Sequence, residues 1–200
     1  MKKILFLFAL SGILISCTKE IIARKYYMLD FPVEQSSTPL EAPVTQDVLE
    51  ILPVQVAEVY AQHRIAVRKR SHEITYYHYH QWGESPDQSI ARLTESKLLQ
   101  ENLFADVSER IWNTSPRYQL QTFVERMEAV EGEDSLFAHL KIKYELFDRS
   151  LKKNVVIHQF DQSVGYEDWD INLISEGMSQ LLSDELQVFA EKIRTFLRKE

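Results

Sequence analysis

The strongest constraint on the fold lies in the second half of the chain, where alternating residues give way to a long apolar stripe. Mostly apolar side chains recur at every second position over 118–124 and again over 138–146, with polar or charged residues between them. This period of two predicts strands of a sheet with one polar face, and residues 155–164 add a third strand. Over 171–196 the apolar residues recur at helical spacing instead, which predicts one long helix with a single apolar side. The sheet and the helix are therefore expected to cover each other's apolar faces.

The first half of the chain predicts shorter strands and a second helix. Strand patterns occupy four runs: 25–31, 48–56, 65–67 and 74–79. A polar segment with two prolines, 33–47, reads as a loop. Ser85 is a suitable N-cap, Pro86 suits the first helical position and Gln88 would complete a capping box, which predicts a helix that ends near Leu103. We expect an α+β chain: a single two-layer domain whose antiparallel or mixed sheet, of about six strands, is covered by two helices.

The first sixteen residues have the composition of an export signal. Met1-Lys2-Lys3 is basic, and the apolar run from Ile4 to Leu10 is too short for a bilayer-spanning helix, which needs about 20 residues. The signal is expected to end in the recognition sequence of the lipoprotein signal peptidase, which consists of Leu14, Ile15, Ser16 and Cys17. The sulfur of Cys17 would then carry diacylglycerol, and its freed amine an acyl chain such as palmitate. The alternative is an ordinary signal peptide that happens to be cut near a cysteine.

The cysteine count supports the lipid. Cys17 is the only cysteine in the chain, whereas exported proteins usually contain cysteines in disulfide-forming pairs. The expected organisation is a signal peptide over 1–16, a lipidated N-terminus and short tether over 17–24, and a folded domain over 25–200. Seven residues reach about 25 Å, so the domain would stay close to its membrane. Thr18 follows the cysteine where an Asp would favour inner-membrane retention, so we expect the periplasmic face of the outer membrane, with that of the inner membrane as the alternative.

The charge of the chain excludes some partners. Loss of Lys2 and Lys3 with the signal takes the formal net charge from −7 to −9. Nucleic acid is bound by neutralising phosphates with Lys and Arg, so a nucleic-acid partner is not expected. Nor is electrostatic binding to anionic headgroups, which leaves the lipid as the membrane anchor.

No catalytic signature stands out. The mature chain has only four glycines, and neither a phosphate-binding loop nor a nucleophile elbow can be found. We therefore expect no enzyme, no catalytic residues and no cofactor beyond the covalent lipid on Cys17. His78 and His80 are weak metal-ligand candidates because two residues apart in a strand share a face. The plainer interpretation makes them polar-face residues of that strand, and Trp82 a core residue before the helix.

The order of short motifs resembles that of the ABC-type transport auxiliary lipoproteins, which include the PqiC-like lipoproteins. The resemblance rests on the following segments: the lipobox, Tyr26-Tyr27-Met28-Leu29-Asp30, Val54-Gln55-Val56, Arg64-Ile65-Ala66-Val67-Arg68, Tyr76-Tyr77, Trp82, and Leu103-Phe104-Ala105-Asp106-Val107. This chain has Val56-Ala57-Glu58-Val59-Tyr60 where many members have a Leu-Pro-Glu-Tyr-Leu-like stretch.

The resemblance implies a non-catalytic accessory subunit of an ABC system that moves lipids between the two membranes. The implied partner is an MCE-domain protein, whose subunits form a hydrophobic conduit, and a homo-oligomeric ring is implied as well. Two alternatives remain open at this point. One is a scaffold lipoprotein for outer-membrane or cell-wall assembly, and the other is a periplasmic enzyme that uses His78, His80 and an acid.

Overall fold

The centre of the sheet is strand β7 (Tyr118–Glu131), because it pairs with four other strands. One edge pairs antiparallel with β8 (Leu136–Asp148), and β8 pairs antiparallel with β9 (Lys153–Tyr166). Three short strands follow one another along the opposite edge, all parallel to β7: β2 (Val48–Ile51), β3 (Gln55–Val56) and β4 (Arg64–Arg70). Beyond β4, the sheet continues with β5 (Glu73–Trp82), which is antiparallel to β4, and then with β1 (Lys25–Tyr27), which is parallel to β5. Beyond β2, it continues with β6 (Asp106–Ser108), which is parallel to β2.

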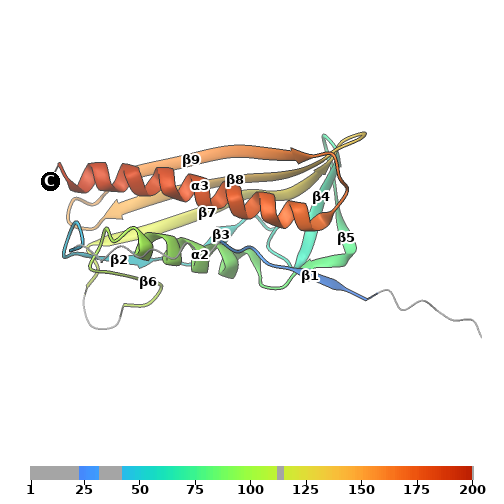
Figure 1. Ribbon diagram of the computed structural model, residues 1–200. Helices are drawn as coiled ribbons and strands as arrows, with labels where there is room; N and C mark the ends of the chain where they lie inside the picture. The colour runs from blue at the N-terminus through green and yellow to red at the C-terminus, as the bar shows by residue number, and fades with distance from the viewer. Residues whose placement is uncertain (1–22, 32–41, 112–114, 200) are drawn as a thin grey trace, which may run out of the picture.

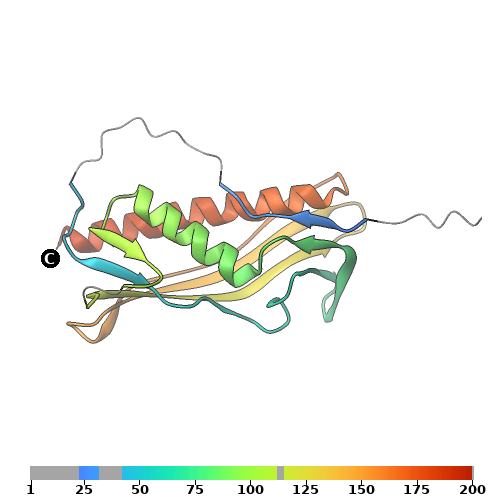
Figure 2. The ribbon, with the colours of Figure 1, turned by 90° about the horizontal axis from the view of Figure 1, so that it is seen from below.

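The computed structural model describes residues 23–31, 42–111 and 115–199. Within them, α2 (Pro86–Gln100) and α3 (Ile171–Leu197) lie in front of the sheet in Figure 1. In Figure 2, seen from below, the two helices lie together on one side of the strands. The predicted α+β fold of two layers is confirmed. The predicted signal over 1–16, with its Leu14, Ile15, Ser16 and Cys17, most of the tether over 17–24, and residues 33–41 of the predicted loop lie outside the described residues.

The core lies between the sheet and the two helices, as the alternation along β8 predicts. Every second residue of β8 from Leu136 to Asp148 is fully buried, while those between them are only half-buried. On the helix side, the stripe of α3 supplies fully buried Ile174, Met178, Leu182 and Phe189. Burial of each such side chain contributes about 1.5–3 kcal/mol, so this seam accounts for much of the stability of the domain.

The prediction of about six strands was too low, because the described residues form a sheet of nine. The run 48–56 is two strands rather than one: Pro53, which has no N–H group, lies between β2 and β3. Strand β6 was missed because three residues are too few to display a period. It is recognisable only from its pairing with β2.

The ends of the helices differ in detail from the prediction. Ser85 is the N-cap of α2 and Pro86 opens the helix, but the side chain of Ser85 makes no capping hydrogen bond, so the predicted capping box is wrong. Instead the carboxylate of Glu84 accepts a hydrogen bond from Ser89 Oγ at 3.0 Å. In α3 the side chain of Asp170 caps the helix by accepting a hydrogen bond from Asn172 N at 2.9 Å.

The N-terminal segment leaves the sheet early and then follows α3. Strand β1 ends at Tyr27, whereas the prediction extended it to residue 31. Ser175 Oγ donates a hydrogen bond to the carbonyl oxygen of Met28 at 2.5 Å, and the N–H of Asp30 donates one to Ser179 Oγ at 3.1 Å. Because 28 lies beside 175 and 30 beside 179, the chain runs in the same direction as α3. The start of β1 therefore lies at the N-terminal end of that helix.

Candidate functional site

The described part of the chain begins at one end of the molecule, which we call the entry end. It comprises residues 23–27, residues 78–81 of β5 and the loop 167–170 that joins β9 to α3. Figure 1 and Figure 2 both show β1 beside the first turn of α3 there. The register of β1 with β5 places Lys25 opposite His80 and Tyr26 opposite Gln81, so the first strand is fixed to the sheet at this end.

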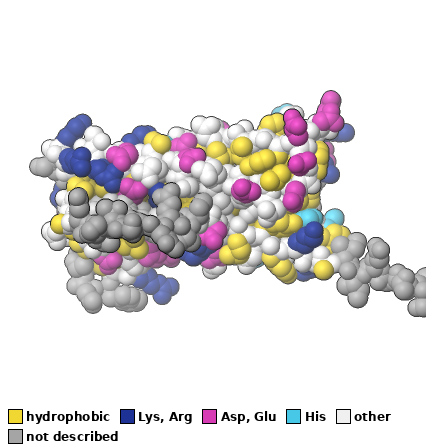
Figure 3. Space-filling view, in the orientation of Figure 1, with side chains coloured by type: hydrophobic (Ala, Val, Ile, Leu, Met, Phe, Trp, Pro, Cys, Tyr) yellow, Lys and Arg dark blue, Asp and Glu magenta, His cyan; other side chains and the backbone are white. Residues whose placement is uncertain are grey.

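Exposed aromatic side chains concentrate at the entry end. Tyr26 is 63% exposed, Trp169 is 52% exposed and Tyr79 is 44% exposed. The other large hydrophobic side chains that the described residues leave exposed are aliphatic: Met28, Val44, Leu99, Leu151, Ile157 and Val188. Hydrophobic atoms gather over the same part of the face seen in Figure 3, next to histidine.

A polar contact at the entry end joins β1 to β5. The hydroxyl of Tyr27 lies 2.7 Å from Nδ1 of His80, and the two rings stack with their centres 5.6 Å apart. Burial and the charge of Lys25 lower the pKa of His80, while Asp170 opposes them. Burial and the charge of Asp170 raise the pKa of Tyr27. The charge of Asp170 acts on both residues, so Trp169, the residue before it, lies at the same end as β1.

The predicted histidine pair does not gather a metal site around it. His80 uses Nδ1 for Tyr27, and the ring of His78 lies edge-on to that of Tyr79. Among the described residues, no group of three or more His, Cys, Asp or Glu side chains lies close enough to hold a metal ion. Trp82 is buried, as predicted for a core residue before the first helix.

The outer face of the sheet carries a network centred on the fully buried Glu128. Its carboxylate accepts hydrogen bonds from Tyr60 Oη at 2.7 Å and from Arg68 Nε and Nη2 at 2.7 and 2.9 Å. His139 lies beside the carboxylate, 3.5 Å from it, and also 2.6 Å from Asp161. Burial alone would raise the pKa of Glu128, but the hydrogen bonds from His139, Arg68 and Tyr60 outweigh it and lower the pKa to about 2.

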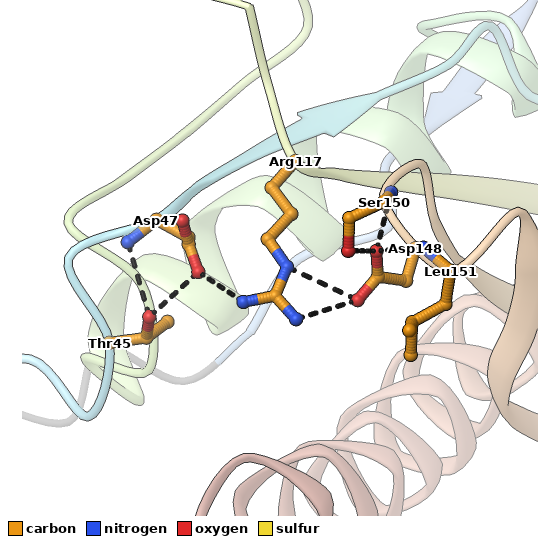
Figure 4. Close-up of polar contacts among 6 residues, drawn as sticks. All are labelled: Thr45, Asp47, Arg117, Asp148, Ser150 and Leu151. Atoms are coloured by element: carbon orange, nitrogen blue, oxygen red, sulfur yellow. Dashed lines mark hydrogen bonds and ion pairs between the residues drawn. The ribbon is translucent and has the colours of Figure 1, made fainter. Parts of the chain in front are cut away.

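A second charged cluster closes the opposite end of the sheet (Figure 4). Arg117 donates from Nε and Nη2 to Oδ2 of the buried Asp148, at 3.2 and 2.9 Å, and from Nη1 to Asp47 at 3.1 Å. The other oxygen of Asp148 accepts hydrogen bonds from Ser150 N and from Leu151 N in the turn between β8 and β9. Burial raises the pKa of Asp148, but these donors and Arg117 lower it overall.

A third polar group lies under α3. His158 of β9 is 5% exposed, and its Nε2 lies 2.8 Å from Glu185 while its Nδ1 lies 2.8 Å from Lys192 Nζ. Its ring stacks near those of Tyr144 and Phe189. Burial and Lys192 lower the pKa of His158, against the opposing effect of Glu185.

These three clusters are built for stability. In each of them the buried charged or titratable side chain is already held by hydrogen bonds from its neighbours. Such a group is engaged by its neighbours, whereas a general base needs a pKa near the working pH and access to a substrate. Among the surfaces of the described residues, the entry end is the most distinctive, because its exposed hydrophobic side chains are aromatic.

The sequence pointed to some of the entry end and missed the rest. Of the aromatic residues of β5, Tyr79 is exposed, Tyr76 is half-buried and Trp82 is buried. Trp169 was missed because it stands in a loop with no period, next to a cap residue. Neither described helix has both the length and the apolar composition required to span a bilayer.

Comparison with known proteins identifies relatives of the whole fold. The family model for the ABC-type transport auxiliary lipoprotein component matches residues 27–187. The crystal structure of a Xanthomonas campestris protein, of the family model DUF330, is 18% identical over 86% of this chain and 95% of its own, with a TM-score of 0.65. The crystal structure of an uncharacterised protein is 12% identical over 86% of this chain and 99% of its own, with a TM-score of 0.66. No curated protein matches the chain.

Proposed function

Because this chain belongs to the ABC-type transport auxiliary lipoprotein family, we propose that it is a membrane-anchored, non-catalytic accessory subunit of an MCE-type transporter. Such a system would move lipids between the inner and the outer membrane. The observation that carries the proposal is the family match over residues 27–187, which spans the sheet and most of α3. The buried charged clusters support the non-catalytic part, because their side chains are engaged by hydrogen bonds to one another.

The anchor is Cys17, with a diacylglycerol thioether on its sulfur and an acyl chain on its amine. Cleavage after Leu14-Ile15-Ser16 would expose that amine. Two or three acyl chains hold a protein on a membrane far more firmly than one, at about 0.8 kcal/mol per buried methylene. The proposed place is the periplasmic face of the outer membrane, because Thr18 is not the Asp that favours retention at the inner membrane. A homo-oligomeric ring around the end of the lipid conduit is part of the same proposal.

Fractionation of cells tests the anchor. Cys17→Ala removes the sulfur, so we expect an uncleaved or soluble protein in place of one that sediments with outer-membrane fractions. Ser16→Ala is the matched control, since it keeps a small residue before the cysteine and should behave like the parent. Cleavage of Cys17→Ala at the same site as the parent, together with its recovery in the outer-membrane fraction, would contradict the anchor.

Co-purification tests the partner. The lipidated chain is solubilised in mild detergent after chemical cross-linking in cells, and its companions are identified by mass spectrometry. We expect an MCE-domain protein together with the permease and ATPase of its transporter. Recovery of a β-barrel protein or a peptidoglycan synthase in their place would support a scaffold for envelope assembly and contradict the transport role.

A further inference from the structure

We propose that the entry end is a membrane-contact surface, in which Tyr26, Tyr79 and Trp169 lie in the headgroup region of the bilayer that carries the lipid anchor. This inference rests on the proposed anchor at Cys17. It adds an orientation: the domain would stand on the membrane by one particular end.

The distribution of exposed aromatic residues is the first argument. Among the described residues, the tyrosine and tryptophan side chains that are largely exposed come from β1, from β5 and from the loop before α3, three segments far apart in the sequence. The fold brings them to one end, and the other large hydrophobic side chains that the described residues leave exposed are aliphatic. Tyr and Trp have an apolar body with a polar tip, and they are enriched where apolar chains meet water at the edge of a bilayer.

The position of the N-terminal segment is the second argument. Five residues separate Cys17 from Ala23, the first described residue, so the chain between them reaches about 20 Å. A lipid on Cys17 therefore keeps the entry end within about 20 Å of the membrane surface. A reach of that length permits contact with the bilayer without enforcing it. The aromatic side chains supply the reason for contact, since their apolar area leaves water when they enter the interface.

The charge of the entry end determines which kind of membrane contact this is. Arg24 and Lys25 are exposed there, together with the acidic residues of the adjoining loop, Glu167, Asp168 and Asp170. Basic and acidic groups largely cancel, so attraction to anionic lipids is weak. The contact should therefore form on zwitterionic lipid and persist in high salt. A second copy of the chain is the other occupant of an aromatic patch, and the experiment below separates the two.

The orientation has a consequence for the rest of the molecule. Helix α3 starts at the entry end and has 27 residues, so its C-terminal end lies about 40 Å away along the helix axis. The turn between β8 and β9, with the exposed Leu151, lies at that far end in Figure 1. The far end would then project away from the bilayer, on the side from which a partner in the periplasm approaches.

Tryptophan quenching tests the contact directly. The lipidated full-length protein is reconstituted into phosphatidylcholine vesicles that carry bromine atoms near the headgroup end of the acyl chains. Its emission is compared with that of Trp169→Phe, which keeps an exposed ring but removes the fluorophore. Trp82 and Trp112 are common to both proteins, so the difference reports Trp169 alone. We expect most of this difference signal to be lost in brominated vesicles, and the loss to be the same after addition of salt or phosphatidylglycerol.

The matched control moves the fluorophore to the other end. In the Trp169→Phe background, Leu151→Trp places a tryptophan at an equally exposed site on the turn between β8 and β9. Its difference signal should be the same in brominated and in ordinary vesicles. Equal quenching at 151 and 169 would overturn the proposed orientation.

Two further outcomes separate this inference from the proposal on which it rests. If the protein floats with the vesicles but bromine leaves the Trp169 signal unchanged, the anchor stands and the membrane-contact surface is overturned. Protection of Trp169 from acrylamide in that case would assign the entry end to a contact between copies of the chain. If the protein does not float with the vesicles, the anchor itself has failed, and the inference falls with it.

Discussion

Glu128 illustrates how one residue can hold a charge inside this sheet and make stability depend on pH. Its pKa is lowered from 4.5 to about 2 in the folded protein. Because the folded pKa lies below the unfolded one, the contribution is complete above pH 4.5 and disappears as the pH falls toward 2. A shift of this size corresponds to about 3 kcal/mol.

His139, beside Glu128, has the opposite pH dependence. Its pKa is raised in the folded protein, so its contribution to stability is present below pH 6.5 and declines as the pH rises through the folded value.

Substitution of Glu128 tests this linkage. At neutral pH, Glu128→Gln should lower the free energy of unfolding by about 3 kcal/mol, because the guanidinium of Arg68 loses its charged acceptor. The deficit should shrink as the pH falls from 4.5 toward 2, which urea unfolding at a series of pH values would measure. Tyr60→Phe removes one hydrogen bond but keeps the carboxylate, so it should retain most of the acid dependence of the parent. A constant deficit of Glu128→Gln at all pH values would contradict the linkage.

Arg117 has the corresponding structural role at the far end (Figure 4). It joins the start of β7 to Asp148 at the end of β8 and to Asp47 ahead of β2. Arg117→Met should cost about 2 kcal/mol, because a buried carboxylate loses its charged donor. Chemical denaturation measures this loss. Arg149→Met is the control at the same end: Arg149 is exposed, and its loss should cost about 0.5 kcal/mol or less. If the two substitutions lowered the free energy of unfolding equally, the burial of Asp148 would not add to the stability that Arg117 contributes.

Among the elements, the contact of α3 with the sheet depends on a residue that has no side chain. A Cβ added at Gly177 would lie 2.6 Å from Val164 Cγ1 and 3.1 Å from the Cβ of Ala138, so the helix can approach β8 and β9 only because this position is glycine. In an open helix, Gly→Ala gains about 1 kcal/mol. At position 177 the steric overlap should make the same substitution destabilising.

We expect Gly177→Ala to lower the free energy of unfolding by about 1–3 kcal/mol, the usual effect of overpacking a core. Thermal and urea unfolding would measure the change. Thr195→Ala on the same helix is the control: Thr195 is exposed, so helix propensity alone should make this variant neutral or slightly more stable. A stabilised Gly177→Ala would show that the helix and the sheet can move apart at no cost.

The whole molecule should unfold as one unit because β7 belongs to both halves of the sheet. It pairs with β2, β3 and β4 on one edge and with β8 on the other, so neither group of strands keeps its core without it. Small single domains usually unfold without populated intermediates. In the unlipidated Cys17→Ala chain, tryptophan fluorescence and far-UV circular dichroism should give the same urea midpoint. Two separate midpoints would indicate that the β8–β9 hairpin and α3 form an independent unit.

Much of the fold could be predicted from local patterns, and the exceptions share one cause. The alternation along β8 and the stripe of α3 identified their elements because each pattern repeats over many residues. The short strands β3 and β6 exist only because a neighbour pairs with them, and a run of two or three residues displays no period. The side chain of Ser85 does not cap α2 even though its sequence context suggests that it would.

The candidate site was only partly foreseeable, for the same reason. The lone cysteine and the apolar N-terminus predict a lipid anchor from composition and order, which need no fold. The order of motifs also led to the family. By contrast, Tyr26, Tyr79 and Trp169 lie at one end of the molecule only after β1, β5 and α3 have been packed together. A sequence by itself therefore determines what depends on near neighbours along the chain: signal, periodicity, element type and fold class. Which distant residues share a surface, and which charges become buried, depends on contacts between remote segments, and those are decided by packing alone.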